Sequence, residues 1–193
     1  MKEKVDLHLQ TDEELAFGVG AGRNVEFFEE LYNRFSKKVY NKCLSFVKNP
    51  EMAEDLTHDV FLQLFVTIRQ FKGKSKFSTW LYSLTYNYCV NHLNRDKNAK
   101  MLRESVEVEE LSEFTDNDDD DKLLWEMESK KLDLALQKVT AEEKMILLLK
   151  YQDDTSIKEL QEVLGISQSA VKMRLSRAKI NLLKAYKEIE HGY

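Results

Sequence analysis

The sequence predicts an all-α protein made of two small helical domains, an N-terminal helical bundle and a C-terminal helix-turn-helix domain, joined by an acidic flexible linker. The 193 residues include only 6 Gly and 1 Pro. Folds rich in strands need turn residues at short intervals, so this scarcity favours long helices. Apolar residues also recur at spacings of three and four, which is the period of one helix face. The charge distribution then divides the chain into segments.

The net charge of -5 conceals a strong segregation of charge along the chain. Residues 24–100 carry a net charge of +4 and residues 129–193 one of +3, whereas residues 101–128 carry -10. Two mildly basic blocks around one very acidic segment indicate that the blocks contact nucleic acid, with the acidic stretch kept away from phosphates.

The first basic block contains the pattern of three long helices. An apolar stripe predicts a helix over 25–47, and Asn49 and Pro50 then suit the N-cap and first position of a second helix over 50–70. A basic loop follows at 71–77, and a third helix is predicted over 78–95. We assign residues 24–97 to the first domain. Residues 1–23 are a terminal tail, either flexible or forming a short helix that covers this domain.

Residues 98–122 are predicted to be the linker, because helical periodicity is lost there and the segment ends in DNDDDD, Asp116 to Asp121. The second domain is predicted over 123–190. It opens with a helix ending near Val139, and Thr140 with Glu143 forms a capping-box pair before the next apolar run.

Residues 156–179, SIKELQEVLGISQSAVKMRLSRAK, have the pattern of a helix-turn-helix. Ser156 caps the first helix, Gly165 supplies the positive φ that the turn needs, and Ser167 caps the second helix. If Val171, Leu175 and Ala178 face the core, amides, hydroxyls, cations and a thioether face outward, and such polar groups can read DNA in the major groove. The predicted DNA-binding set is Gln168, Ser169, Lys172, Met173, Ser176 and Arg177. A helical hairpin with a merely solvated basic face is the alternative.

Two segments of the first domain make the interpretation more specific. AEDLTHDVFLQLF at 53–65 and FKGKSKFSTWLYSLTYNYCVNHLNR at 71–95 resemble the second region of extracytoplasmic function (ECF) sigma factors, the small members of the bacterial sigma-70 family. The helix-turn-helix and its preceding helix resemble the fourth region of the same family. Together the two resemblances cover roughly 24–97 and 128–187, in the family's order.

The resemblance implies a polymerase-binding surface on the second helix. Asp55, His58, Asp59 and Leu62 share one helix face by their spacing of three and four. In the family the matching face binds the clamp of core RNA polymerase. A solvated acidic face is the other interpretation of this spacing.

The basic loop and the third helix are expected to bind the minus-ten promoter element. The loop combines three lysines with Phe71, Phe77 and Trp80, and cations with aromatic rings suit single-stranded DNA. Trp80 could equally belong to the core. The resemblance implies that this loop captures a flipped base and that three polar residues of the next helix meet the same element. The predicted set is Lys72, Lys74, Lys76, Ser78, Asn87, Asn91 and Arg95.

Further partners follow from the resemblance. The second domain would bind the polymerase flap and the minus-thirty-five element, and the acidic linker would thread near the active-site cleft. A separate anti-sigma protein is a further implied partner, although no residue points to one. The implied function is promoter-specific transcription initiation. A helix-turn-helix regulator with a sensing domain and a polymerase-binding sigma mimic remain as alternatives.

The sequence contains no catalytic constellation, no metal-ligand cluster and no cofactor motif, so we expect neither enzyme activity nor a cofactor. Cys43 and Cys89 lie within helical apolar patterns and are predicted to be buried free thiols. No apolar run approaches the roughly 18 residues of a membrane span. We expect a cytoplasmic protein without membrane insertion.

Overall fold

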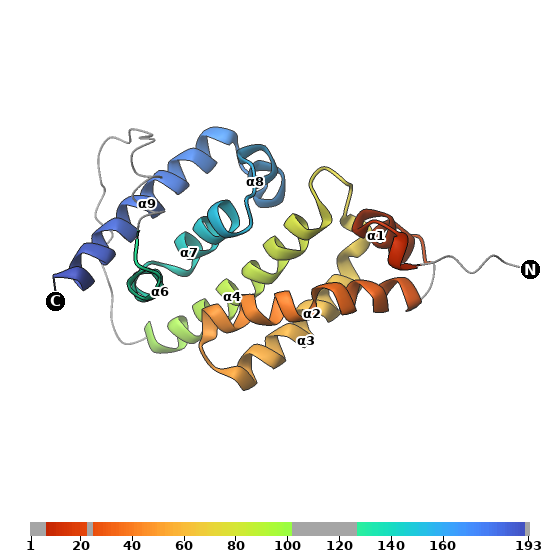
Figure 1. The fold of residues 1–193 in the computed structure, drawn as a ribbon, viewed down its shortest axis with the longest axis horizontal. Coiled ribbons are helices and arrows are strands. Elements are labelled where there is room, and N and C mark those ends of the chain that lie inside the picture. The colour runs from red at the N-terminus through yellow and green to blue at the C-terminus, as the bar shows by residue number, and fades with distance from the viewer. Residues whose placement is uncertain (1–6, 23–24, 102–126, 192–193) are drawn as a thin grey trace, which may run out of the picture. The chain divides into compact units, whose positions relative to one another are not determined.

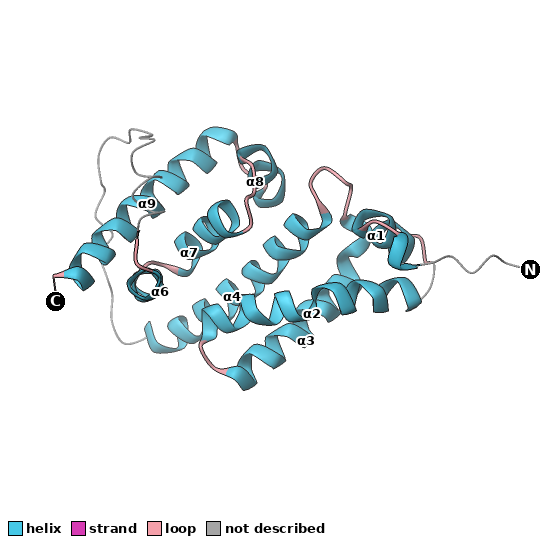
Figure 2. Ribbon diagram, viewed as in Figure 1, coloured by secondary structure: helices cyan, strands magenta, loops and turns pink. Residues whose placement is uncertain are grey.

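The computed structural model describes residues 7–22, 25–101 and 127–191, and in these ranges the regular structure is entirely helical (Figure 2). The chain divides into two compact units, residues 1–92 and 93–193. We call them the first and second modules. This organisation confirms the predicted all-α fold with two helical domains. No helix in the described ranges is long and apolar enough to cross a membrane.

The first module contains two whole long helices, α2 (Val25–Val47) and α3 (Pro50–Thr67), and most of α4 (Phe77–Met101), whose residues from 93 onward belong to the second unit. These helices are shown from orange to green in Figure 1. A 3-10 turn, η2 (Ile68–Gln70), follows α3. The predicted apolar stripes form the core, with Val39 of α2, Val60 of α3 and Leu81 of α4 all fully buried. Asn49 caps α3 as predicted, since its side chain accepts a hydrogen bond from the Met52 amide over 3.0 Å.

The N-terminal residues also fold. A 3-10 turn, η1 (Leu7–Leu9), precedes the helix α1 (Asp12–Gly20), which packs against α2 and η2. Thr11 and Glu14 form a capping box at its start, and Leu15 and Ala16 are buried. Of the two alternatives for residues 1–23, the described part therefore matches the short helix that covers the first module.

The second module consists of α6 (Ser129–Lys138), α7 (Ala141–Leu147), a wider π turn η3 (Leu148–Gln152), α8 (Ile157–Leu164) and α9 (Gln168–Glu190). Capping boxes at Thr140 and Ser156 confirm the predicted helix starts. Gly165 ends α8 at φ 65° and Ser167 caps α9, so the predicted turn chemistry is also confirmed.

Helix α4 extends further than the predicted helix over 78–95. Helix α4 continues to Met101, so the first residues of the predicted linker at 98–122 are helical, because the chain there still lacks a helix-breaking residue. Helix α6 starts at Ser129, and the predicted resumption of the helical pattern near Leu123 lies outside the described residues. The rest of the predicted linker and its acidic run fall in residues 102–126, outside the described residues.

Candidate nucleic-acid and polymerase interfaces

The first half of α9 presents a polar and cationic face. Its cap is local, because the Ser167 hydroxyl accepts a hydrogen bond from the Ala170 amide over 3.2 Å. Five of the six predicted DNA-binding residues of this helix are exposed: Gln168, Ser169, Lys172, Met173 and Arg177. This face offers amides, hydroxyls and two cations, a combination that can contact both base edges and phosphates.

Ser176 was wrongly placed on this outward face. Only 6% of its surface is exposed, and the neighbouring cation Lys179 is buried as well. The reason is that α6, α7 and α8 all pack against α9, so its buried arc is wider than one amphipathic stripe. A short hydroxyl side chain on the flank of that arc is covered, which removes Ser176 from the base-reading set.

The basic loop places three exposed lysines, Lys72, Lys74 and Lys76, between two buried rings, Phe71 and Phe77. The ring centroids of Phe71 and Phe77 are 5.6 Å apart, so the two ends of the loop are held together. A short cationic loop on a rigid base is suited to binding the phosphates of a single strand.

Trp80 belongs mainly to the support of this loop. Its ring centroid lies 5.7 Å from that of Phe71 and 6.3 Å from that of Phe77, and the side chain is half-buried. The core alternative is therefore favoured over a freely stacking ring. Sequence reasoning missed Arg69, an exposed cation directly before the loop whose carbonyl accepts a hydrogen bond from Lys72 Nζ over 3.2 Å.

Along α4, the predicted DNA-facing residues lie on one exposed face. Asn87, Asn91 and Arg95 are all exposed and follow one another at intervals of four residues. Ser78, in the first turn, is half-buried. Because α4 begins at Phe77, directly after the lysines, the loop and this helix face follow one another along the chain.

The outer face of α3 is acidic at its start and apolar at its end. Asp55, His58 and Asp59 are exposed, and Leu62 is 68% exposed. The same face continues into two residues that the sequence reasoning missed, namely Phe65, 58% exposed, and Val66, 73% exposed. Their spacing from Leu62 is the signal that could have found them. Large apolar side chains rimmed by carboxylates are typical of a protein-binding surface.

A cavity of about 370 Å³ opens beside this face, lined by Met52, Asp55, Leu56, Asp59 and His92 with neighbouring residues. The imidazole Nε2 of His92 lies 3.2 Å from the sulfur of Met52. Within the described part of the chain, no group of His, Cys, Asp and Glu side chains could hold a metal ion. Cys43 and Cys89 are buried free thiols, as predicted, and a hydrogen bond with Cys89 lowers the pKa of Cys43 below its ordinary value.

Comparison with known families explains this arrangement. Residues 31–99 match sigma-70 region 2, and residues 129–182 match sigma-70 region 4. The chain is 28% identical over 156 residues to the RNA polymerase sigma factor YlaC of Bacillus subtilis, an alignment that covers 81% of this chain and 90% of YlaC. It is 27% identical over 168 residues to the ECF sigma factor SigW of the same organism, covering 84% and 90% of the two chains.

The chain belongs to the sigma-70 family, as an ECF sigma factor. Solved structures show the same fold. The sigma factor RpoE, solved with the anti-sigma factor NepR from Bartonella quintana, gives a TM-score of 0.59 at 17% identity and covers 84% of this chain and 98% of its own. CnrH, solved with the cytosolic domain of CnrY, gives 0.55 at 18% identity, covering 95% and 100%.

The matched segments contain the surfaces described above. The basic loop, the outer face of α3 and the polar face of α4 lie within the region 2 match, and the outward face of α9 lies within the region 4 match. The N-terminal turn and α1 of this sigma factor precede the region 2 match, which begins at residue 31.

Proposed function

We propose that this sigma factor directs core RNA polymerase to promoters by binding the minus-ten element with its first module and the minus-thirty-five element with its second. The observation that carries the proposal is the exposed lysine loop held between the buried rings of Phe71 and Phe77, in a chain that also bears a cationic recognition helix. Helping to melt the duplex is a matter of binding, because holding the opened strand offsets the lost pairing and stacking.

The minus-ten set comprises the loop and the polar face of α4. The lysines neutralise phosphates without reading sequence, whereas the amides of Asn87 and Asn91 can read base edges. The full proposed set is Lys72, Lys74, Lys76, Ser78, Asn87, Asn91 and Arg95.

The minus-thirty-five set is the outward face of α9 without Ser176. Lys172 and Arg177 provide the cations, and Met173 offers an apolar contact to a thymine methyl group. Gln168 and Ser169 lie in the first turn of α9, the part of a recognition helix that reaches base edges.

Core polymerase is the proposed protein partner. The outer face of α3, with Asp55, His58, Asp59 and Leu62, binds the clamp, and the second module binds the flap. The carboxylates of this face complement a basic surface, while Leu62, Phe65 and Val66 supply the apolar area to bury.

An anti-sigma protein is a further proposed partner. Two structural relatives were solved with such a protein or domain bound, RpoE with NepR and CnrH with CnrY. The sigma factor itself catalyses no reaction in this proposal: polymerase forms the phosphodiester bonds, and both act in the cytoplasm.

The decisive experiment is run-off transcription with the purified chain, core polymerase and a library of promoter fragments. Specific start sites that depend on the chain support the proposal. Stable polymerase binding without specific starts would indicate a sigma mimic, and duplex binding without polymerase binding would indicate an ordinary regulator.

A further inference from the structure

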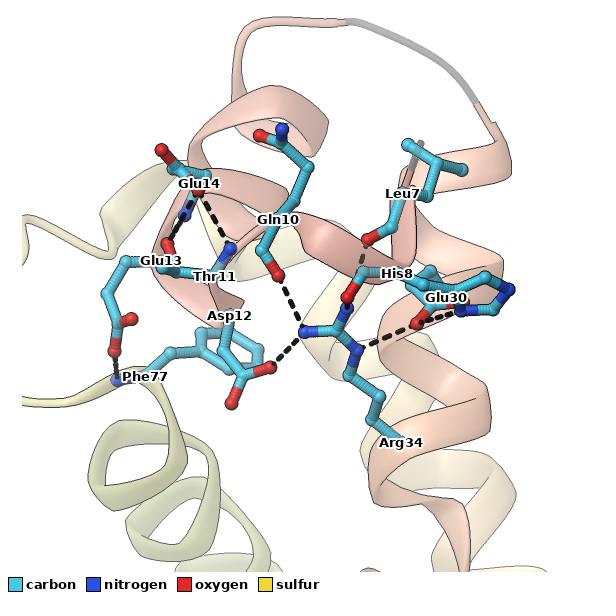
Figure 3. Close-up of polar contacts among 10 residues, drawn as sticks. All are labelled: Leu7, His8, Gln10, Thr11, Asp12, Glu13, Glu14, Glu30, Arg34 and Phe77. Atoms are coloured by element: carbon cyan, nitrogen blue, oxygen red, sulfur yellow. Dashed lines mark hydrogen bonds and ion pairs between the residues drawn. The ribbon is translucent and has the colours of Figure 1, made fainter. Parts of the chain in front are cut away.

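The N-terminal segment, residues 7–20, is anchored to α2 through one guanidinium group. Arg34 donates hydrogen bonds to the carbonyls of Leu7 and Gln10 over 3.0 and 2.9 Å and to the Asp12 carboxylate over 2.8 Å (Figure 3). Glu30 holds the same group from the α2 side, 2.8 Å from Arg34 Nε. The partners of Arg34 in the segment, with the His8 carbonyl at 3.3 Å, fix the path of the chain before α1 begins.

Helix α1 then packs closely on α2. Leu15 and Ala16 are buried against the module. A Cβ added to Gly18 would lie 2.6 Å from the ring of Phe27, so a larger residue at this position would displace that ring. The segment is therefore a fixed part of the first module.

Glu13 reaches from α1 to the start of α4. Its Oε1 accepts a hydrogen bond of 2.8 Å from the Phe77 amide (Figure 3). Phe77 is the first residue of α4, and the residue before it, Lys76, has no acceptor in its side chain. A carboxylate from elsewhere in the chain thus satisfies an amide that the local sequence leaves open, and its charge suits a helix N-terminus.

Phe17 contacts the other end and the middle of the loop. Its ring centroid lies 5.3 Å from that of Phe71. Its Cζ would lie 3.1 Å from a Cβ at Gly73, a residue whose φ of +67° also favours glycine. Together with Glu13, α1 therefore contacts the chain before, within and after the stretch that carries the three lysines.

We propose that residues 7–20 form a brace that fixes the basic loop in its DNA-binding conformation, with Glu13 and Phe17 as positioning residues for capture of the single strand. The inference rests on the proposed function of the loop in binding the minus-ten strand. It assigns a part in that step to residues that precede the region 2 match at 31–99.

The physical reason is preorganisation. Three lysines within five residues repel one another, and a free loop would lose conformational entropy when DNA orders it. A brace that orders the loop in advance removes this cost from the binding step. Both brace contacts end on the two ends of the loop, at Phe71 and at the first amide of α4, so losing them should affect the loop first.

Two readouts on the full chain test the brace. The first is hydrogen–deuterium exchange of residues 71–80 in the free protein. The second is promoter opening with core polymerase, measured by the fluorescence of 2-aminopurine placed in the non-template strand of a minus-ten element. The variants are Glu13→Ala, Glu13→Gln and Phe17→Ala, with Glu29→Ala, an exposed carboxylate of α2, as the matched control.

Glu13→Ala should raise the exchange rate at the start of α4 and lower the extent of opening, each by about fivefold, the usual effect of a lost helix cap. Glu13→Gln should lie between wild type and Glu13→Ala, because its amide oxygen still accepts the hydrogen bond without the charge. Phe17→Ala should also reduce opening, while Glu29→Ala changes neither readout. Polymerase affinity should stay within about twofold for all variants, since the brace is separate from the clamp face.

Unchanged exchange in both Glu13→Ala and Phe17→Ala would overturn the brace itself. Faster exchange with unchanged opening, or an equal loss of polymerase binding and opening, would overturn its role in strand capture. A wild-type chain that opens no promoter would instead contradict the proposed function of the loop, and the exchange measurement would still decide whether the brace exists.

Discussion

In the core of the first module, Lys42 Nζ donates a hydrogen bond of 3.0 Å to the hydroxyl of Tyr86. The ammonium group also lies 4.0 Å from the ring centroid of Tyr82, so two α4 rings surround a cation that belongs to α2. Tyr86 is fully buried, and Lys42 is buried as well. A charge in this position is tolerated because the hydroxyl and the ring faces replace part of its hydration.

Tyr86→Phe should therefore destabilise the first module by about 1–3 kcal/mol, because it removes an acceptor from a buried charge. Lys42→Met should cost less, since it removes the charge and keeps the apolar stem. Exchange of the α2 and α4 amides under native conditions measures both changes within this module. The double variant should resemble Lys42→Met alone, and fully additive costs would contradict the pairing.

Gly165 offers a cleaner test of backbone strain. Its φ is 65°, and a Cβ added there would meet nothing within 4 Å. Gly165→Ala should cost about 1–2 kcal/mol through conformation alone, and Gly165→Asn should cost less because asparagine tolerates the left-handed region. Denaturant unfolding, with exchange of the α8 and α9 amides as the probe, measures the free energy of unfolding of each variant. Equal costs for the two substitutions would show that the turn needs glycine for another reason.

The burial of Ser176 separates two neighbouring residues of α9. Arg177→Ala should weaken binding to minus-thirty-five DNA and lower the slope of log K against log salt by about 0.9, as expected for one lost phosphate contact. Ser176→Ala should leave both affinity and sequence preference unchanged. Titration of holoenzyme on a labelled duplex at several salt concentrations tests both. A changed base preference in Ser176→Ala would restore it to the reading face.

The apolar end of the α3 face should contribute to polymerase affinity. Leu62→Ala is expected to weaken binding to core polymerase about tenfold, as for a central interface residue, with little change in stability because the side chain is 68% exposed. Asn33→Ala, an exposed change on α2, is the control. Competition against a labelled sigma factor measures the affinity. Identical affinities for the two variants would argue against this face as the clamp site.

The anchor of the N-terminal segment should depend on pH. The hydrogen bond from Arg34 lowers the pKa of Glu30 below its ordinary value of 4.5. A lowered folded-state pKa means that the stabilisation is present above the unfolded-state value and is lost as the pH falls through the folded-state value. The protection of the amides of residues 7–20, taken relative to their intrinsic exchange rate at each pH, should therefore fall below about pH 4.5 in the wild type. Glu30→Gln should exchange faster at neutral pH and show a weaker dependence on acid.

Local chemistry made most of the fold predictable. The caps at Asn49, Thr140, Ser156 and Ser167 act within three residues, so the sequence alone identifies them. The apolar stripes likewise predicted the core, since a helix period is a local property. The outward faces of α3, α4 and α9 followed from the same periodicity, together with the family resemblance.

The errors and omissions arise where distant segments meet. The burial of Ser176 depends on three helices packing around α9, and the cap on Phe77 depends on a carboxylate 64 residues away. Neither arrangement has a local pattern. Phe65 and Val66 are different, since their spacing of three and four residues from Leu62 is a local pattern of the sequence.

The contact between Glu13 and Phe77 shows that the start of the folded module differs from the start of the family match. The region 2 match begins at residue 31, yet a chain cut there would lose the acceptor for the first amide of α4 and the ring that lies on Phe71. Residues 7–20 therefore belong to the folded first module although they lie outside the family match. During synthesis, Glu13 leaves the ribosome before Phe77. The amide at the start of α4 can therefore find its acceptor as soon as it emerges, without any residue that follows it in the chain.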